Sequence, residues 1–274
     1  MVKKTKPLLR IFCYLPTPRI WKSSITARLL DLNIEIRGTK PTEVKDWLWD
    51  FDARPLTNED KLRLANKTTK GKTGFSIKLY KTEEFLKAHP YGTIPAAFSP
   101  DGKIGIFESN SIMRLVARLK TKNNTLYGSN PYETSRIDSF LDASLIFARS
   151  SQKYLLAINN NSVNKSIRNE AKEAYINYLT GIENALKESK NSFIIGNKIT
   201  LADICFFCEY SLFYREIIPN KNKLNNSIIN ELGLNTFNYA NKHFKKLRNN
   251  PNFNIDAKPY LESIEKKLTT TNIK

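Results

Sequence analysis

The hydrophobic pattern at the start of the chain predicts a strand, a helix and a second strand. Residues 8–15 form a short apolar run rich in β-formers, and Pro16 ends it. Apolar residues then recur at three- and four-residue spacing between positions 25 and 32, which indicates a helix. Residues 33–37 alternate polar and apolar side chains as far as Gly38. This order predicts a right-handed βαβ unit with a parallel strand pair.

A second group of elements follows after a long interval. Residues 93–98 and 103–107 have strand-like composition and flank a turn sequence at residues 100–102, so they predict a β-hairpin. Residues 109–119 continue with a helical pattern. The two groups together predict a compact α/β domain.

From residue 130 onward the pattern is helical. Asn130 can cap a helix whose first residue is Pro131, and a second helix is predicted over residues 165–190. Thr200 and Asp203 have the spacing of a capping box at the start of a third helix. We therefore expect two domains, an α/β domain at residues 1–125 and an all-helical domain at residues 126–274.

The interval between the two N-terminal groups, residues 38–82, is an insertion that is too long for a simple loop. A segment of this length must carry structure of its own. Trp47, Trp49 and Phe51 occupy alternate positions in it, which predicts one aromatic face.

Composition and charge favour a folded protein with a basic surface. The 274 residues are 41% hydrophobic and carry a net charge of +18. No stretch approaches the ~18 consecutive apolar residues of a membrane span, so no membrane partner is expected. The stretch from Lys61 to Lys81 contains basic residues and no acid. It can be interpreted as a phosphate-binding track or as lysine-rich solvated surface, and we favour the second, without nucleic acid as a partner.

The cysteines and histidines predict neither a disulfide framework nor a metal site. Cys13, Cys205 and Cys208 are too few and too unevenly placed for disulfides, which indicates a reducing, cytoplasmic compartment. Cys205 and Cys208 have CxxC spacing but lie in an apolar helical segment, which favours packing over redox chemistry. His89 and His243 have no partner at metal-ligand or triad spacing.

Three segments resemble signature motifs of the glutathione transferase superfamily, and they come in the order found in that family. They are PYGTIP at residues 90–95, FESNSI at 107–112 and FIIGNKITLAD at 193–203. The second motif, together with the RIWK sequence at residues 19–22, is similar to the transferase-like domain of the gamma subunit of translation elongation factor one. The resemblance covers roughly residues 8–37 and 83–255. It implies a thioredoxin-like N-terminal domain followed by an all-helical C-terminal domain.

The resemblance implies a glutathione site at the first two motifs. The family has a cis peptide bond at the position of Pro95, so that the backbone of Ile94 would pair with the cysteinyl part of glutathione. Ser109 and the helix start would bind the γ-glutamyl carboxylate, and Glu108 would bind the ammonium. An ordinary edge-strand proline and a serine cap with a solvated glutamate are the alternatives.

The resemblance also implies a group that lowers the pKa of the glutathione thiol. Tyr14 has the spacing of the tyrosine type of the family, and Thr17 lies at the start of the first helix, where other members have serine, cysteine or asparagine. Either hydroxyl can donate a hydrogen bond to a thiolate. We rank Tyr14 before Thr17, with a packing role for Tyr14 as the alternative.

The function implied by the resemblance is that of a glutathione transferase. Such an enzyme would conjugate glutathione, as co-substrate, to a small apolar electrophile, or reduce a peroxide with it. The alternative is a non-catalytic module that keeps the fold and docks partner proteins, translation components among them. The insertion at residues 38–82 would either wall the electrophile pocket or form a packed surface extension.

The resemblance also implies a homodimer, because family members usually pair about a two-fold axis. In such pairs the N-terminal domain of one subunit meets the helical domain of the other. The first 125 residues are strongly basic, with 24 Lys or Arg against 12 Asp or Glu. Their expected counterparts on the helical domain are acidic: Glu133, Asp138 and Asp142.

Overall fold

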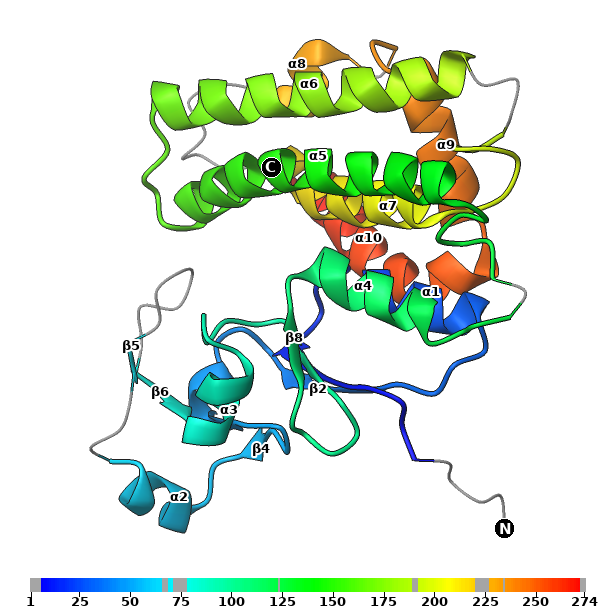
Figure 1. Cartoon of the computed structure of the whole chain (residues 1–274). Helices are drawn as coiled ribbons and strands as arrows, with labels where there is room; N and C mark the ends of the chain where they lie inside the picture. Colours follow the sequence, from blue (N-terminus) through cyan, green and yellow to red (C-terminus); the bar gives the residue numbers. More distant parts are fainter. Residues whose placement is uncertain are drawn as a thin grey trace. The chain divides into compact units, whose positions relative to one another are not determined.

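The computed structural model describes most of the chain (Figure 1). The described residues are 6–65, 69–70, 78–122, 124–188, 192–219, 227–233 and 235–271. They form two compact units, Met1–Thr121 and Lys122–Lys274. The first unit combines sheets and helices, whereas the described part of the second contains helices without strands. This is the predicted fold class.

The sheet of the first unit has the strand order β2-β1-β7-β8. β1 pairs in parallel with β2 and antiparallel with β7, and β8 pairs antiparallel with β7. The predicted βαβ unit and β-hairpin are therefore both present. The elements are β1 (Arg10–Tyr14), α1 (Pro18–Leu29), β2 (Glu35–Thr39), β7 (Ala96–Phe98), β8 (Gly105–Phe107) and α4 (Ser109–Arg118).

The second strand runs further than its sequence pattern indicates. Gly38 was expected to end it, yet β2 continues through Gly38 to Thr39. Gly38 pairs with Cys13 of β1, and a Cβ atom at Gly38 would lie 1.8 Å from the carbonyl oxygen of Cys13. Glycine is thus required here by the close approach of two backbones and does not break the strand.

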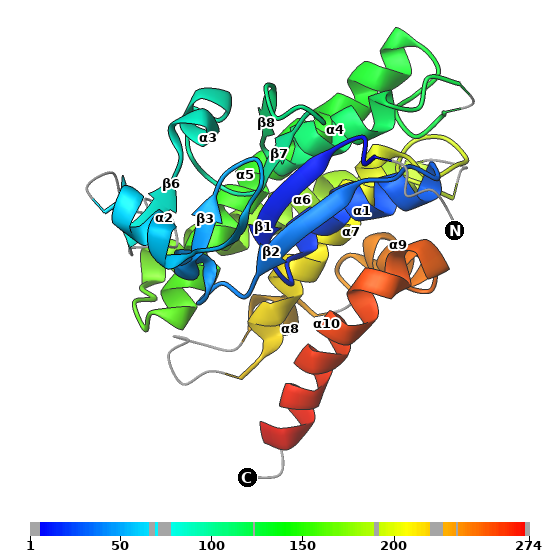
Figure 2. The ribbon, with the colours of Figure 1, turned by 90° about the horizontal axis from the view of Figure 1, so that it is seen from below.

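The insertion carries a sheet of its own, with the strand order β4-β3-β6-β5. Figure 2 shows β3 of this sheet beside the β1–β2 pair, with β6 next to β3. The helix α3 follows β6 and leads back toward β7. The elements are η1 (Val44–Asp46), β3 (Trp47–Trp49), β4 (Arg54–Pro55), α2 (Asn58–Arg63), β5 (Thr69–Lys70), β6 (Lys78–Lys81) and α3 (Glu83–Ala88).

The aromatic residues of the insertion pack against the main sheet. The ring of Phe12 on β1 stacks on Trp47 at 5.9 Å and meets the edge of Trp49 at 5.6 Å. Phe51 contacts Phe98 of β7 edge to face at 6.0 Å. The predicted aromatic face therefore exists, and it joins the insertion to the thioredoxin-like sheet through one buried cluster.

The second unit is a bundle of long helices. Asn130 caps α5 by accepting hydrogen bonds from the backbone N–H groups of Tyr132 and Glu133, both at 3.0 Å. Thr200 and Asp203 form the predicted capping box at the start of α7, whose residues from Leu201 to Phe213 are all buried. The elements are α5 (Pro131–Asn159), α6 (Lys165–Glu188), α7 (Leu201–Tyr214), η2 (Arg215–Ile217), α8 (Ile228–Leu232), α9 (Asn238–Arg248) and α10 (Pro251–Thr271).

Two further features bear on possible partners. Among the described residues, no helix combines the length and the apolar composition that crossing a bilayer requires. The basic stretch of the insertion is not exposed over its whole length. Lys81 is buried, and its ammonium donates to the carbonyl oxygen of Gly92 at 2.7 Å. Lys67 and Lys72 of that stretch lie outside the described residues.

Candidate functional site

The candidate glutathione-binding residues meet at one end of the main sheet. β7 runs antiparallel to both β1 and β8. The start of β7 therefore lies at the same end of the sheet as the ends of β1 and β8. These three chain segments contain Tyr14 and Thr17, Ile94 and Pro95, and Glu108 and Ser109. The topology therefore brings together all six residues that the resemblance implies.

Ile94 presents its backbone at this end of the sheet. The Ile94–Pro95 peptide bond is cis, and β7 begins only at Ala96. Within the part of the chain that the structure describes, no hydrogen bond of the Ile94 backbone is found. A backbone N–H and C=O that the fold leaves unused are available to an extended ligand segment.

Glu108 and Ser109 form the junction between β8 and α4. Glu108 precedes the helix with φ 67° and ψ 122°, a conformation that a residue with a Cβ atom rarely adopts. Its side chain is exposed, whereas Ser109, the first residue of the helix, is buried. Strained backbone of this kind is concentrated at functional sites. The N-terminal end of α4 suits a carboxylate.

Lys22 is a part of this site that the sequence analysis named only as the last residue of the RIWK motif, without a role in the site. Its side chain is 1% exposed, and its ammonium donates to Oδ1 of Asn110 at 2.7 Å and to Oγ of Ser109 at 3.2 Å. A buried positive charge thus lies beside the start of α4. Lys22 precedes Ile25 by three residues and Leu29 by seven, so helical periodicity could have placed it on the buried face.

The two candidate thiol activators have different surroundings. Tyr14 is half-buried and packs against the aromatic cluster that contains Phe12 and Trp49. Thr17 is 1% exposed, and its hydroxyl has no hydrogen-bond partner in the described structure. Thr17 precedes α1 as its N-cap residue without a side-chain capping bond. A buried hydroxyl at a helix start is a donor that the protein itself leaves unused.

The cysteines are buried and are not suited to this chemistry. Burial raises the pKa of the Cys13 thiol to about 12, so this group stays protonated. Cys205 and Cys208 are buried in α7, as expected for packing residues. Within the described ranges, no group of three or more His, Cys, Asp or Glu side chains has the arrangement of a metal site.

Comparison with protein families and known sequences gives three further findings. The glutathione S-transferase C-terminal domain family matches residues 145–226, in the helical unit. Elongation factor 1-gamma 2 of Oryza sativa subsp. japonica is 32% identical over 174 residues, which are 63% of this chain and 38% of that protein. Elongation factor 1-gamma of Rattus norvegicus is 29% identical over 201 residues, 69% of this chain and 43% of that protein. The chain therefore matches well under half the length of these relatives.

Solved structures extend the likeness to almost the whole chain. An epsilon-class glutathione S-transferase from the housefly, Musca domestica, has a TM-score of 0.61 with 15% sequence identity, over 94% of this chain and 98% of that one. A Methylobacillus flagellatus glutathione S-transferase, solved with glutathione bound, has a TM-score of 0.62 with 10% identity, over 91% and 98%. At these identities the likeness concerns the fold alone.

Three kinds of observation agree with one another. They are the sequence motifs, the two-unit architecture and the matched relatives. The chain has the fold of the glutathione transferases, a thioredoxin-like unit followed by a helical unit, its residues 145–226 match the glutathione S-transferase C-terminal domain family, and it resembles elongation factor 1-gamma.

Proposed function

We propose that the chain is a non-catalytic, transferase-like module that docks proteins of translation elongation. The observation that carries this proposal is the similarity to elongation factor 1-gamma, at 29–32% identity in the rice and rat proteins. The transferase structures share the fold at only 10–15% identity. Since one fold hosts many functions, the nearer sequence relationship carries more weight than the fold.

The surroundings of Tyr14 support the same proposal. Tyr14 was our first choice for the thiol activator, and its side chain packs in the aromatic cluster between the main sheet and the insertion. Trp47 and Trp49 of the insertion lie against Phe12, two residues before Tyr14 on the same strand. This arrangement supports the interpretation of the insertion as a packed extension that uses Tyr14 for stability.

The proposal is tested by binding and activity measured on one preparation of the full chain. We expect a stable complex with the remaining subunits of elongation factor 1 from the same organism, detected by size-exclusion chromatography with light scattering. We also expect no turnover of glutathione with 1-chloro-2,4-dinitrobenzene above the rate without protein. Turnover that disappears in Tyr14→Phe or Thr17→Val would instead establish the chain as a transferase.

A second function, the binding of glutathione itself, has support from the site. The unused backbone of Ile94, the start of α4 at Ser109 and the unused Thr17 hydroxyl offer complementary groups to the peptide backbone, the carboxylate and the thiol of glutathione. A docking module can retain such a site without turnover.

Calorimetric titration with glutathione tests this second function. Ser109→Ala removes a hydrogen bond to a charged group and is expected to weaken binding by roughly ten- to a hundred-fold. Ser111→Ala, two residues further along α4, is the matched control and should bind like the wild type. If the wild type shows no heat of binding at millimolar glutathione, the site is not a glutathione site.

A further inference from the structure

A buried lysine near the end of the insertion is bonded to the chain segment that leads into β7. Lys81 is the last residue of β6 and is 9% exposed. Its ammonium donates to the carbonyl oxygen of Gly92 at 2.7 Å and lies 5.0 Å from the centre of the Trp49 ring. Gly92 comes two residues before Ile94, whose backbone carries the candidate ligand-binding groups. The insertion is therefore bonded directly to the loop that enters the site.

The fold holds the lysine side chain at both of its ends. β6 pairs in parallel with β3, and Lys81 lies opposite Trp49, so the strand pairing fixes the backbone of the lysine. A buried ammonium is costly unless a polar group accepts its hydrogens, and the carbonyl of Gly92 is such an acceptor. The face of the Trp49 ring attracts the same charge. The position of the ammonium is thus set by contacts on both sides.

The turn before Ile94 is hydrogen-bonded on both sides of Gly92. Its N–H donates to the carbonyl oxygen of His89 at 2.8 Å, and its carbonyl accepts from Lys81. Gly92 has φ 58°, in the left-handed region that favours glycine. A Cβ atom there would lie 3.0 Å from the Leu86 side chain and 3.3 Å from the Lys81 ammonium. Glycine therefore permits both the turn and the close approach of the lysine.

The insertion also contacts the chain at the other end of β7. Phe51 packs edge to face on Phe98, the last residue of β7, at 6.0 Å. In the turn between β7 and β8, Gly102 has φ 76°, and a Cβ atom on it would lie 2.7 Å from Cγ of Phe51. The insertion thus holds β7 before the strand, through Lys81, and after it, through Phe51.

We propose that Lys81 is a positioning residue that presents the backbone of Ile94 to an extended ligand segment. Its bond fixes the peptide group of Gly92, which adjoins the peptide group that contains the Ile94 N–H. A backbone held in the bound conformation loses less freedom when a ligand pairs with it, which raises affinity. The inference rests on the second function proposed above, glutathione binding, and it assigns the insertion a part in that function.

Lys81→Met tests the bond, because methionine keeps an unbranched apolar side chain and lacks the ammonium. Hydrogen exchange of the Gly92 amide, followed by NMR on the full chain, should become faster by roughly ten-fold or more. Lys78→Met, at the exposed first residue of the same strand, is the matched control and should leave this rate unchanged. An unchanged rate in Lys81→Met would overturn the proposal.

A second measurement depends on the charge of Lys81. Burial, and after it the charge of Lys81, lowers the pKa of His89. Lys81→Met should therefore raise this pKa toward 6.5, whereas Lys78→Met should leave it unchanged. The chain has two histidines, so His89→Phe identifies the imidazole NMR signal to follow. A pKa that does not move would place the ammonium elsewhere in solution and contradict the proposal.

Calorimetric titration with glutathione separates the role of Lys81 from the function on which it rests. Lys81→Met should weaken binding by roughly ten-fold, and Lys78→Met should bind like the wild type. Faster exchange at Gly92 with unchanged affinity would overturn the positioning role. A wild type that binds no glutathione, together with faster exchange at Gly92 in Lys81→Met, would refute the glutathione site and still support the control of this loop by Lys81.

The wild type alone provides a test if Lys81→Met does not fold. Acetic anhydride should label the exposed Lys78 and leave the buried, hydrogen-bonded Lys81 unmodified, as read by peptide mass spectrometry. Equal labelling of the two lysines in the native protein would overturn the proposal.

Discussion

The ammonium of Lys22 lies 2.7 Å from Oδ1 of Asn110 and 3.2 Å from Oγ of Ser109, with the lysine side chain almost completely buried. These bonds join α1 to the first turn of α4, and the two helices pack together. The Ser109 hydroxyl oxygen accepts from Lys22, so the hydroxyl hydrogen of Ser109 remains available to donate to an anion. Lys22 thus holds the candidate carboxylate site in place and adds positive charge to it.

Replacing Lys22 by methionine is expected to lower the free energy of unfolding by about 1–3 kcal/mol. The variant keeps most of the side-chain volume but removes the donor for two buried oxygens. Denaturant unfolding measures the change. Lys45→Met, at an exposed lysine of the same unit, is the control and should stay within about 0.5 kcal/mol of the wild type. Equal stability of Lys22→Met and wild type would mean that burying the charge costs as much as its bonds contribute.

Thr17→Val is expected to raise the free energy of unfolding by roughly 1 kcal/mol. Valine has nearly the same shape, and the lost hydroxyl has no partner in the described structure. Thr26→Val is the contrasting variant, because the Thr26 hydroxyl donates to the carbonyl oxygen of Lys22 at 2.6 Å and its loss should not stabilise. A lower stability for Thr17→Val would reveal a partner for the hydroxyl in solution.

If glutathione binds, the same position distinguishes the two candidate activators. Thr17→Val should raise the pKa of the bound thiol, which thiolate absorbance in the ultraviolet reports, while Tyr14→Phe should leave that pKa unchanged. The expectation follows from the unused hydroxyl of Thr17 and the packing of Tyr14. The reverse pattern would restore Tyr14 as the activator.

His89 is expected to make the thioredoxin-like unit less stable in mild acid. It is fully buried between the rings of Phe85 and Phe107, and its Nε2 lies 3.4 Å from Oγ1 of Thr93. Burial, and after it the charge of Lys81, lowers its pKa below the usual 6.5. The unfolded chain therefore binds a proton at a pH where the folded chain does not. Stability contributed by neutral His89 is present above about pH 6.5 and is lost as the pH falls through the lowered pKa.

The measurement is denaturant unfolding of wild type and His89→Phe between pH 7.5 and 5. Phenylalanine retains the ring stacking and cannot be protonated, so the variant should lose part of the pH dependence below about pH 6.5. Identical pH profiles for the two proteins would show that His89 does not titrate in this window.

Asp203 is expected to be essential for the helical unit. Its carboxylate is fully buried and accepts from the Thr200 N–H at 2.8 Å, from the Ile194 N–H at 3.0 Å and from Nε2 of His243 at 2.8 Å. The Thr200 hydroxyl also donates to this carboxylate at 2.9 Å, so Asp203→Ala removes the acceptor of four buried donors. We expect the free energy of unfolding to fall by about 3 kcal/mol or more, measured by denaturant unfolding. Glu173→Ala, at an exposed position on α6, serves as the comparison, and a similar small effect at both sites would refute the role of Asp203.

We also expect a homodimer that tightens as salt is added. Two subunits of charge +18 repel each other until salt screens the charges beyond about 10 Å at 0.1 M. Part of the acidic surface expected on the helical unit is used locally: Asp138 accepts from the Tyr127 hydroxyl at 2.8 Å, and Glu133 accepts from Ser129 at 2.6 Å. Sedimentation equilibrium at about 0.3 M salt and high protein concentration checks this, and a monomer there would refute it.

Local signals in the sequence were sufficient to predict most of the helices and strands. The caps at Asn130 and Thr200 act within one helical turn, so their chemistry is readable from neighbouring residues. The aromatic face of Trp47, Trp49 and Phe51 could likewise be predicted from the two-residue period of an extended chain. The sequence pattern did not show what that face covers. Short sequence motifs were also enough to identify Ile94 and Pro95, and Glu108 and Ser109, as candidate site residues through the resemblance.

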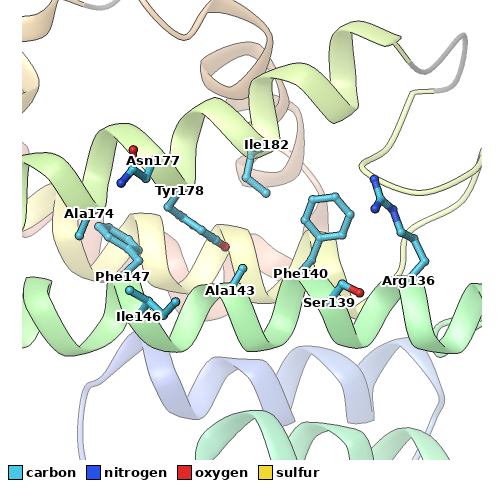
Figure 3. Close-up of a pocket in the computed structure, with 11 residues that line it drawn as sticks. Arg136, Ser139, Phe140, Ala143, Ile146, Phe147, Ala174, Asn177, Tyr178 and Ile182 are labelled. Atoms are coloured by element: carbon cyan, nitrogen blue, oxygen red, sulfur yellow. The ribbon is translucent and has the colours of Figure 1, made fainter.

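The tertiary structure decided the features that depend on residues far apart in the chain. Lys22 is a buried donor only because Asn110, 88 positions away, lies beside it. Gly38 continues a strand because the backbone of Cys13 approaches it. Tyr14 packs against the aromatic cluster, whereas the Thr17 hydroxyl is buried without a partner in the described structure, and both facts depend on residues distant in the sequence. The groove between α5 and α6 exists because small residues of the two helices face each other (Figure 3). Burial and the loss of water from a polar group depend on three-dimensional packing, and residue spacing along a single chain does not encode which distant side chains will meet.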